Sequence, residues 1–199
     1  MTVAKTNILH DLLSVNGGVI KTHMLCDNGF SSRDIKQLVQ DGILERVKQG
    51  YYIEKQGVVS DIEIISKLLP MGVLCLFTAI DYYGLATVNP TEICVALPRG
   101  ATCPVLPPNL YVRIYHMTGS HFEAGIINTE VNGTMARVYD AEKTVCDCFK
   151  YDNDVEKGIA MEVLKNYIAD GNCNIQKLME YAKLLGKKKI IYPYVEALI

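Results

Sequence analysis

The sequence lacks a hydrophobic run long enough to cross a bilayer, for which a helix needs about 20 apolar residues. Its longest apolar stretch, residues 68–79, contains Pro70 and Gly72. Residues 1–20 have the pattern of an amphipathic helix and lack the apolar core of a signal peptide. The seven cysteines have irregular spacing, which argues against a secreted disulfide scaffold. We therefore expect a cytoplasmic protein.

The sequence also lacks a large excess of charge of either sign. Its 199 residues have a formal net charge of −2, so no strong global field attracts nucleic acid or an anionic membrane. Any attraction to DNA must be local. Hydrophobic residues make up 49% of the chain and charged residues 21%, which indicates a globular protein with a substantial core. The length allows one or two domains.

Motifs for metal, nucleotide and nuclease sites are missing as well. There is no Cys-x-x-Cys and no helical His-x-x-x-His, and Cys146 and Cys148 would point apart on a helix. No glycine-rich phosphate loop is present. Restriction-type nucleases need an acid-x-Lys pair on a strand, but the only one here, Asp34-Ile35-Lys36, falls within a predicted helix. We expect no catalytic residues, no metal and no cofactor.

Two short helices in tandem are predicted near the start of the chain. The first follows a longer helix over residues 4–15 and stops at Gly29. Ser31 and Ser32 can cap the second, because a serine oxygen accepts from the unpaired amides of a first helical turn. Gly42 ends this second helix.

A two-stranded wing follows the helix pair. An apolar strand over residues 43–47, a turn at Gln49-Gly50 and a returning strand over residues 51–53 complete the pattern. Helix, turn, helix and wing together predict a winged helix-turn-helix domain over residues 1–56. This fold presents one helix to the major groove of DNA.

The second helix of the pair has one polar and one apolar face. At about 100° per residue, its polar side chains fall within an arc of about 100°, opposite Ile35, Leu38 and Val39. The polar set is Arg33, Lys36, Gln37 and Gln40. Cations suit phosphates or guanine edges, and glutamine pairs with adenine. Arg46 and Lys48 lie beside the turn of the wing, where they can reach the sugar-phosphate backbone.

The charge of this segment leaves a second interpretation open. Residues 31–55 carry five cations and four acids, and a net charge of +1 is small for a protein that neutralises phosphates. A DNA-binding domain of this kind is expected to act as a homodimer or cooperatively, so that weak half-site contacts add. The alternative is a winged helix that docks another protein without specific DNA binding.

Residues 57–199 predict an α+β domain with a mostly antiparallel sheet and a helical C-terminal tail. Its strands are expected in β-branched and aromatic runs over residues 92–97, 110–116, 126–130 and 135–139. Its helices are expected over residues 60–69, 75–83, 140–150, 155–169, 174–185 and 188–198. Asn132-Gly133, between the last two strands, is a strong hairpin signal because both residues tolerate positive φ.

The order of these motifs resembles the AbiEi family, the antitoxin half of type IV toxin–antitoxin systems. Three segments carry the likeness: GGVIKTHMLCDNGFSSRDIKQLVQDGILERVKQGYYI, FTAIDYYGLATVNPTEICVALPRG and VNGTMARVYDAEKTVCDCFKY. Together they cover most of residues 17–151. The resemblance implies a cytoplasmic bacterial protein of the abortive-infection, phage-defence class, and not an enzyme.

The resemblance implies two roles. The winged domain would bind double-stranded DNA at the promoter of its own operon and repress it. The second domain would support cooperative DNA binding and neutralise an AbiEii-like nucleotidyltransferase toxin, without a stable complex between the two. The implied DNA-binding residues are Ser32, Arg33, Lys36, Gln37, Gln40, Arg46, Lys48 and Tyr51.

The same resemblance points to the start of the helix at residues 140–150. Its tentative toxin-neutralisation surface consists of Asp140, Glu142, Lys143 and Asp147. A catalytic reading of this cluster is disfavoured, because Asp140 is well placed as an N-cap and Glu142 suits the positive end of the helix dipole. Asp147 lies four residues after Lys143, a spacing that allows an ordinary surface ion pair.

Overall fold

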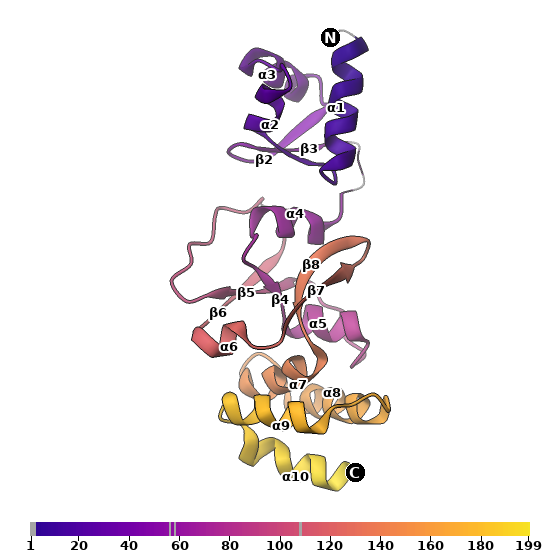
Figure 1. Ribbon diagram of the computed structural model, residues 1–199, viewed down its shortest axis with the longest axis vertical. Coiled ribbons are helices and arrows are strands. Elements are labelled where there is room, and N and C mark those ends of the chain that lie inside the picture. The colour runs from indigo at the N-terminus through magenta and orange to yellow at the C-terminus, as the bar shows by residue number, and fades with distance from the viewer. Residues whose placement is uncertain (1–2, 56, 58, 108) are drawn as a thin grey trace. The chain divides into compact units, whose positions relative to one another are not determined.

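The computed structural model describes residues 3–55, 57, 59–107 and 109–199, which fold into two compact units of α+β structure (Figure 1). The first unit comprises the chain up to Pro70 together with Cys103–Leu110. The second comprises Met71–Thr102 and Tyr111–Ile199. Each unit has its own hydrophobic core. No helix in the described ranges is long and apolar enough to cross a membrane.

The first unit combines helices with a small antiparallel sheet. In chain order its elements are α1 (Val3–Val15), β1 (Val19–Lys21), α2 (Thr22–Asp27), α3 (Ser32–Gln40), β2 (Leu44–Lys48), β3 (Tyr51–Glu54) and α4 (Asp61–Leu68). The strand order is β1-β3-β2. One buried cluster joins Leu9 and Leu13 of α1 with Leu25 of α2 and with Ile35 and Leu38 of α3. The apolar face predicted for α3 therefore faces this core.

A capping box at Ser31 fixes the start of α3. The hydroxyl oxygen of Ser31 accepts a hydrogen bond from the backbone N–H of Asp34 at 3.2 Å, and the Asp34 carboxylate accepts from the backbone N–H of Ser31 at 2.8 Å. Ser32 is the first residue of the helix. Gly42 follows its end with a φ of 71°, a left-handed conformation that glycine adopts without steric cost. The predicted helix is thus confirmed.

The hairpin of β2 and β3 matches the predicted pair of strands, but the sheet has a third strand. The register pairs Lys48 of β2 with Tyr51 of β3, after an irregularity in the ladder. β1, which was not predicted, pairs with the other side of β3 and places Lys21 opposite Tyr51. Tyr51 therefore has a lysine on each neighbouring strand.

α4 extends the first unit beyond the predicted domain boundary. That boundary falls at Gln56, which lies outside the described residues. Ser60 starts α4 by accepting a hydrogen bond from the backbone N–H of Glu63 at 3.1 Å. The helix buries Ile62 and Ile65, and it belongs to the first compact unit together with Cys103–Leu110, a segment of the connection between two strands of the second unit.

The second unit contains a five-stranded sheet and a group of helices at its C-terminal end. Its first elements are β4 (Val73–Leu74), α5 (Leu76–Tyr83), β5 (Ile93–Pro98), β6 (Val112–Met117), α6 (Gly119–Glu123), β7 (Ile126–Val131) and β8 (Thr134–Tyr139). The helices that follow are α7 (Ala141–Lys150), α8 (Lys157–Ala169), α9 (Ile175–Leu184) and α10 (Lys188–Leu198). The helical tail is confirmed.

The prediction of a mostly antiparallel sheet is wrong, because the sheet is mixed. Its strand order is β6-β5-β4-β8-β7. β5 pairs parallel with β6, and β4 pairs parallel with β8, whereas β4–β5 and β7–β8 are antiparallel. The two-residue strand β4 lies in the middle and is too short to give a periodic signal, so its partners could not be predicted. The β7–β8 hairpin turns at Asn132 and Gly133, both with positive φ as predicted.

α7 is the central helix of the second unit. It contacts α5, α8, α9 and α10, and Figure 1 shows it beside α8, between the sheet and the helices α9 and α10. Every side chain from Glu142 to Phe149 is buried. A helix enclosed in this way must satisfy its polar side chains internally.

Candidate functional site

The polar face predicted for α3 is exposed in the first unit. Its members are Ser32, Arg33, Lys36, Gln37 and Gln40, and all are exposed to solvent. On the opposite face, Ile35 is 4% exposed and Leu38 is 1% exposed. The exposed donors on α3 are therefore available to a partner along the length of the helix.

A groove of about 430 Å³ lies between α3 and the hairpin. Ser32, Lys36 and Gln40 line its helix side. Arg46 of β2 and Tyr52 of β3 line its sheet side. The fold thus brings two cations and one amide from separate elements to one groove, where they can contact the same anionic partner.

The end of the hairpin carries a second group of cations, around the ring of Tyr51. The ammonium of Lys48 lies 5.3 Å from the ring centroid, and that of Lys21 lies 5.4 Å from it. Both distances are within the range of cation–π attraction, which restrains the two lysines beside the ring. Lys21 was missed from the sequence because β1 was not predicted, although Val19 and Ile20 are β-branched residues at a strand position.

Hydrogen bonding separates the polar side chains of α3 and of the neighbouring strand β2 into occupied and free groups. Gln37 donates to Asp41 Oδ1 at 2.7 Å. Within the described part of the chain, no hydrogen bond or ion pair engages the side chains of Arg33, Lys36, Gln40 or Arg46. The free group is the one best placed to bind a partner.

Asp34, the acid at the start of α3, is neutralised within the unit. Lys5 Nζ of α1 donates to Asp34 Oδ2 at 2.8 Å. This hydrogen bond, with those from the backbone and hydroxyl of Ser31, holds the pKa of the Asp34 carboxyl well below its usual range. Asp34 therefore opposes an approaching phosphate less than the count of charges over residues 31–55 suggests.

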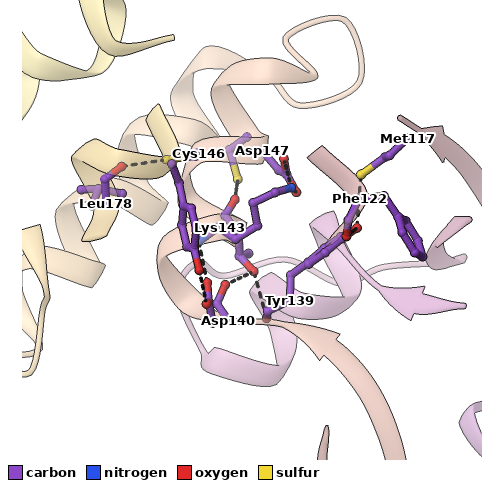
Figure 2. A network of polar contacts seen from close by, with 11 residues as sticks. Met117, Phe122, Tyr139, Asp140, Lys143, Cys146, Asp147 and Leu178 are labelled. Atoms are coloured by element: carbon purple, nitrogen blue, oxygen red, sulfur yellow. Dashed lines mark hydrogen bonds and ion pairs between the residues drawn. The ribbon is translucent and has the colours of Figure 1, made fainter. Parts of the chain in front are cut away.

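The four residues expected to form an exposed toxin-neutralisation surface are instead buried in the second unit. Asp140 and Glu142 are 7% and 9% exposed, and Lys143 and Asp147 are fully buried. Figure 2 shows Asp140, Lys143 and Asp147 in one network with Tyr139 and Cys146. They do not form an accessible patch, because α7 is covered by its neighbouring helices.

Asp140 has the predicted capping role and also links α7 to α9. Its Oδ1 accepts from the backbone N–H of Lys143 at 2.9 Å. Its Oδ2 accepts from Lys177 Nζ and from the hydroxyl of Tyr181, each at 3.0 Å. Lys177 Nζ also reaches Glu142 Oε2 at 3.1 Å. One lysine of α9 therefore joins the two carboxylates at the start of α7.

The pKa of Glu142 reflects two opposing effects. Burial acts to raise it, but hydrogen bonds from the helix backbone, from the hydroxyl of Tyr167 at 2.8 Å and from Lys177 lower the pKa below its usual value. The carboxylate is therefore held ionised at the helix start, where the helix dipole favours a negative charge.

The expected surface pair between Lys143 and Asp147 is a buried ion pair. Lys143 Nζ donates to both carboxylate oxygens of Asp147 at 2.7 Å, and lies 4.2 Å from the centroid of the Tyr139 ring. The side chains are 0% and 1% exposed. Burial raises the pKa of Asp147, whereas Lys143 opposes that rise. A pair with these contacts and almost no solvent exposure has a structural role.

The two cysteines of α7 are also engaged within the core. Cys146 Sγ donates to the carbonyl of Leu178 at 3.4 Å, and Cys148 Sγ donates to that of Thr144 at 3.2 Å. Burial raises the pKa of both thiols, which disfavours the thiolate needed for nucleophilic or metal-binding chemistry. Among the described residues, no three His, Cys, Asp or Glu side chains are grouped as a metal site.

The comparisons with known proteins find similarity in structure but not in sequence. No family model and no curated protein matches the sequence. The fold is similar to the crystal structure of the RV2827C protein from Mycobacterium tuberculosis, with a TM-score of 0.67 over 92% of this chain and 72% of that chain. The two sequences are 14% identical, so the similarity concerns the fold alone.

Proposed function

We propose that the protein is a DNA-binding transcriptional repressor whose first unit is a winged helix-turn-helix domain. The order of α2, α3 and the β2–β3 hairpin supports this proposal. α3 would be the recognition helix and the hairpin the wing. The nine residues of α3 span about 13 Å at ~1.5 Å per residue, a length that suits a major groove about 12 Å wide.

The concentration of unpaired cations on α3 and the hairpin carries the proposal. Arg33 and Lys36 on the helix, and Arg46 in the groove beside it, have no acidic partner among the described residues. Lys21 and Lys48 extend this positive surface to the end of the hairpin. The whole chain has a net charge of −2, so this local concentration is what an anionic polymer would recognise.

The proposed division of labour follows from which groups are free. Arg33, Lys36 and Gln40 would face the bases, since their side chains are exposed and have no described partner. Lys21, Arg46 and Lys48 would hold the phosphates on either side. Phosphate contacts fix the register on DNA, and base contacts supply the sequence preference.

We further propose an antitoxin role in a type IV system, and this rests on the resemblance to the AbiEi family alone. The partner would be a nucleotidyltransferase-like toxin in the cytoplasm. Asp140, Glu142, Lys143 and Asp147 would contribute only by maintaining the second unit, because they are buried. A neutralising surface would have to consist of other, exposed residues.

Binding to the DNA upstream of the gene tests the repressor proposal. We would compare the wild-type protein with the Arg33→Ala/Lys36→Ala double variant by fluorescence anisotropy at several salt concentrations. The matched control is Lys165→Ala/Lys183→Ala, which removes two exposed cations from the second unit. We expect the first double variant to lose its preference for the upstream sequence but to keep weak, salt-dependent binding to any DNA, because the proposed phosphate contacts of Lys21, Arg46 and Lys48 remain.

Two outcomes would contradict this proposal. Equal binding by both double variants would exclude α3 as the reading element, and absence of binding by the folded wild-type protein would favour the protein-docking alternative. The antitoxin role needs a separate test, with the gene under an unrelated promoter. Rescue of growth by the Arg33→Ala/Lys36→Ala variant, when the neighbouring toxin gene is induced, would show neutralisation independent of repression.

A further inference from the structure

The five-stranded sheet of the second unit ends on one side in β7, whose outer edge carries unpaired backbone groups. The backbone N–H of Asp140 bonds to the carbonyl of Gly125 at 2.7 Å, and Val131 pairs with Thr134 across the hairpin turn. Because hydrogen-bonded and non-bonded pairs alternate along an antiparallel ladder, the odd-numbered residues of β7 bond to β8. The backbone groups of its even-numbered residues therefore point away from the sheet. These residues are Ile126, Asn128 and Glu130.

The outward backbone groups of β7 have no partner within the described part of the chain, where no hydrogen bond engages them. The hydroxyl of Tyr82 lies 3.0 Å from Thr129 Oγ1, so this contact holds the middle of the strand through a side chain and does not use its outward backbone groups. The side chains of Asn128 and Glu130 are exposed. The edge is therefore open to another strand.

β7 lacks the features with which proteins usually block an open edge. Lysine, proline and β-bulges on an edge strand all oppose the addition of a further strand. β7 has six residues and contains neither lysine nor proline, and its pairing with β8 is regular from end to end. By contrast β2, an edge strand of the first unit, has an irregular register beside Lys48. The edge of β7 is thus suited to pairing.

The sequence of β7 is complementary to a second copy of itself. An antiparallel copy centred on Asn128 places this residue opposite its own equivalent, and places Glu130 opposite Ile126 of the other copy. Each of these outward pairs exchanges two backbone hydrogen bonds. Glu130 is the only charged residue of the strand, so no like charges face each other. Ile127 lies opposite Thr129 of the other copy, and β-branched neighbours of this kind favour strand pairing.

We propose that two copies of the chain associate through β7, as antiparallel edge strands centred on Asn128, and form one continuous sheet. A register centred on Glu130 is disfavoured because it places two carboxylates opposite each other. The strand is short, and the chain turns away at Asn132 and Gly133, so the interface is small and association depends on protein concentration. β7 belongs to the second unit and has no part in the proposed DNA interface.

Opposite charges introduced at Asn128 test this register directly, because the residue faces its own equivalent. We would measure the mass of the full-length protein by analytical ultracentrifugation over a series of concentrations, without DNA. The wild type should form dimers as the concentration rises, and Asn128→Lys and Asn128→Asp should each dimerise several-fold more weakly. An equimolar mixture of the two variants should regain dimers. Asn172→Lys, an exposed change between α8 and α9, is the matched control and should dimerise like the wild type.

Amide hydrogen exchange identifies the strand that pairs. The amides of Ile127 and Thr129 are already protected by β8, whereas those of Asn128 and Glu130 are free in a single copy. A higher concentration should slow the exchange of this second pair in the wild type and in the mixture, but not in either variant alone. A wild type that stays monomeric, or dimers that both variants form as readily, would overturn the proposal. So would protection of these amides that arises only when a foreign peptide is added.

Discussion

The ammonium of Lys143 donates to both carboxylate oxygens of Asp147 in the interior of the second unit, at 2.7 Å each. The two residues are four apart on α7, and the ring of Tyr139 closes the lysine side. Such a pair has lost its hydration, and only its own geometry compensates for that loss. Neither charge can therefore be removed alone without leaving the other unsatisfied.

We expect Lys143→Met to destabilise the protein by about 3–5 kcal/mol, because it leaves Asp147 as an unpaired buried carboxylate. The double variant Lys143→Met/Asp147→Leu should be more stable than either single variant, since it removes both charges. Urea unfolding of the four proteins measures the coupling. Lys187→Met is the control: it breaks a pair with the exposed Asp152 and should cost no more than about 1 kcal/mol. A Lys143→Met cost as small as this would contradict the assignment.

Gly125 shows how closely the chain approaches the start of α7. Its φ is 76°, and an added Cβ would lie 2.8 Å from Lys143 Cβ and 3.0 Å from Asp140 Oδ1. Gly133 has a similar φ of 81° but no atom within 4 Å of such a Cβ. Both Gly→Ala variants should lower the free energy of unfolding by about 1–2 kcal/mol, because alanine is strained in the left-handed conformation. Gly125→Ala should lower it clearly more, because its added Cβ also meets other atoms. Equal losses of stability in thermal unfolding would show that the close approach does not matter.

Apart from the five-residue helix α6, which was not predicted, the described helices and the two hairpins were predictable because their ends are marked locally. Ser31 and Asp140 cap α3 and α7, and Asn132-Gly133 turns the β7–β8 hairpin, each through contacts within a few residues. The strands β1 and β4 have three and two residues and so carry no periodic pattern. They form because neighbouring strands offer them hydrogen bonds, which only the assembled sheet supplies. Because β4 was not predicted, its parallel pairing with β8 at the middle of the sheet could not be predicted either.

The residues of the candidate site also fall into a part that the sequence predicted and a part that it did not. The exposed polar face of α3 follows from the helical period, because residues three or four apart in the sequence lie on the same face of a helix. The burial of Lys143 and Asp147 could not be predicted from the sequence, since charged residues spaced four apart on a helix ordinarily lie at the surface. Only the packing of α5, α8, α9 and α10 around α7 excludes water there. Lys21 was missed because its strand was missed.

Asp34 should make the stability of the first unit depend on acidity. Its pKa is lower in the folded state than the usual value of 3.8, so the ionised carboxylate stabilises the fold above that value. That contribution is lost as the pH falls below it, toward the folded-state pKa. Asp34→Ala should therefore flatten the loss of stability between about pH 4 and about pH 2, measured by urea unfolding. Asp27→Ala, at the exposed end of α2, is the control, and an identical profile for Asp34→Ala and the wild type would refute the argument.

Lys21 is expected to contact phosphate, although the sequence did not indicate it. Lys21→Ala should weaken DNA binding uniformly across sequences and reduce the slope of the salt dependence by about 0.9. Tyr51→Leu should reproduce part of this loss, because it removes the ring that holds Lys21 and Lys48, whereas Tyr51→Phe keeps that ring face. Lys165→Ala serves as the control for a change of charge. An unchanged slope for Lys21→Ala would remove β1 from the interface.

Gln37 and Gln40 both lie on the polar face of α3, but they should not contribute equally to sequence recognition. Gln37 must break its 2.7 Å hydrogen bond to Asp41 before it can pair with a base, whereas Gln40 has no described partner and lines the groove beside Arg46. Gln40→Ala should therefore lose about 1–3 kcal/mol of discrimination at one base pair, and Gln37→Ala less. Binding to a panel of sites with single base-pair changes measures this difference. A larger effect of Gln37→Ala would show that the contact with Asp41 opens on DNA, and Asp41→Ala would then strengthen binding by releasing the amide.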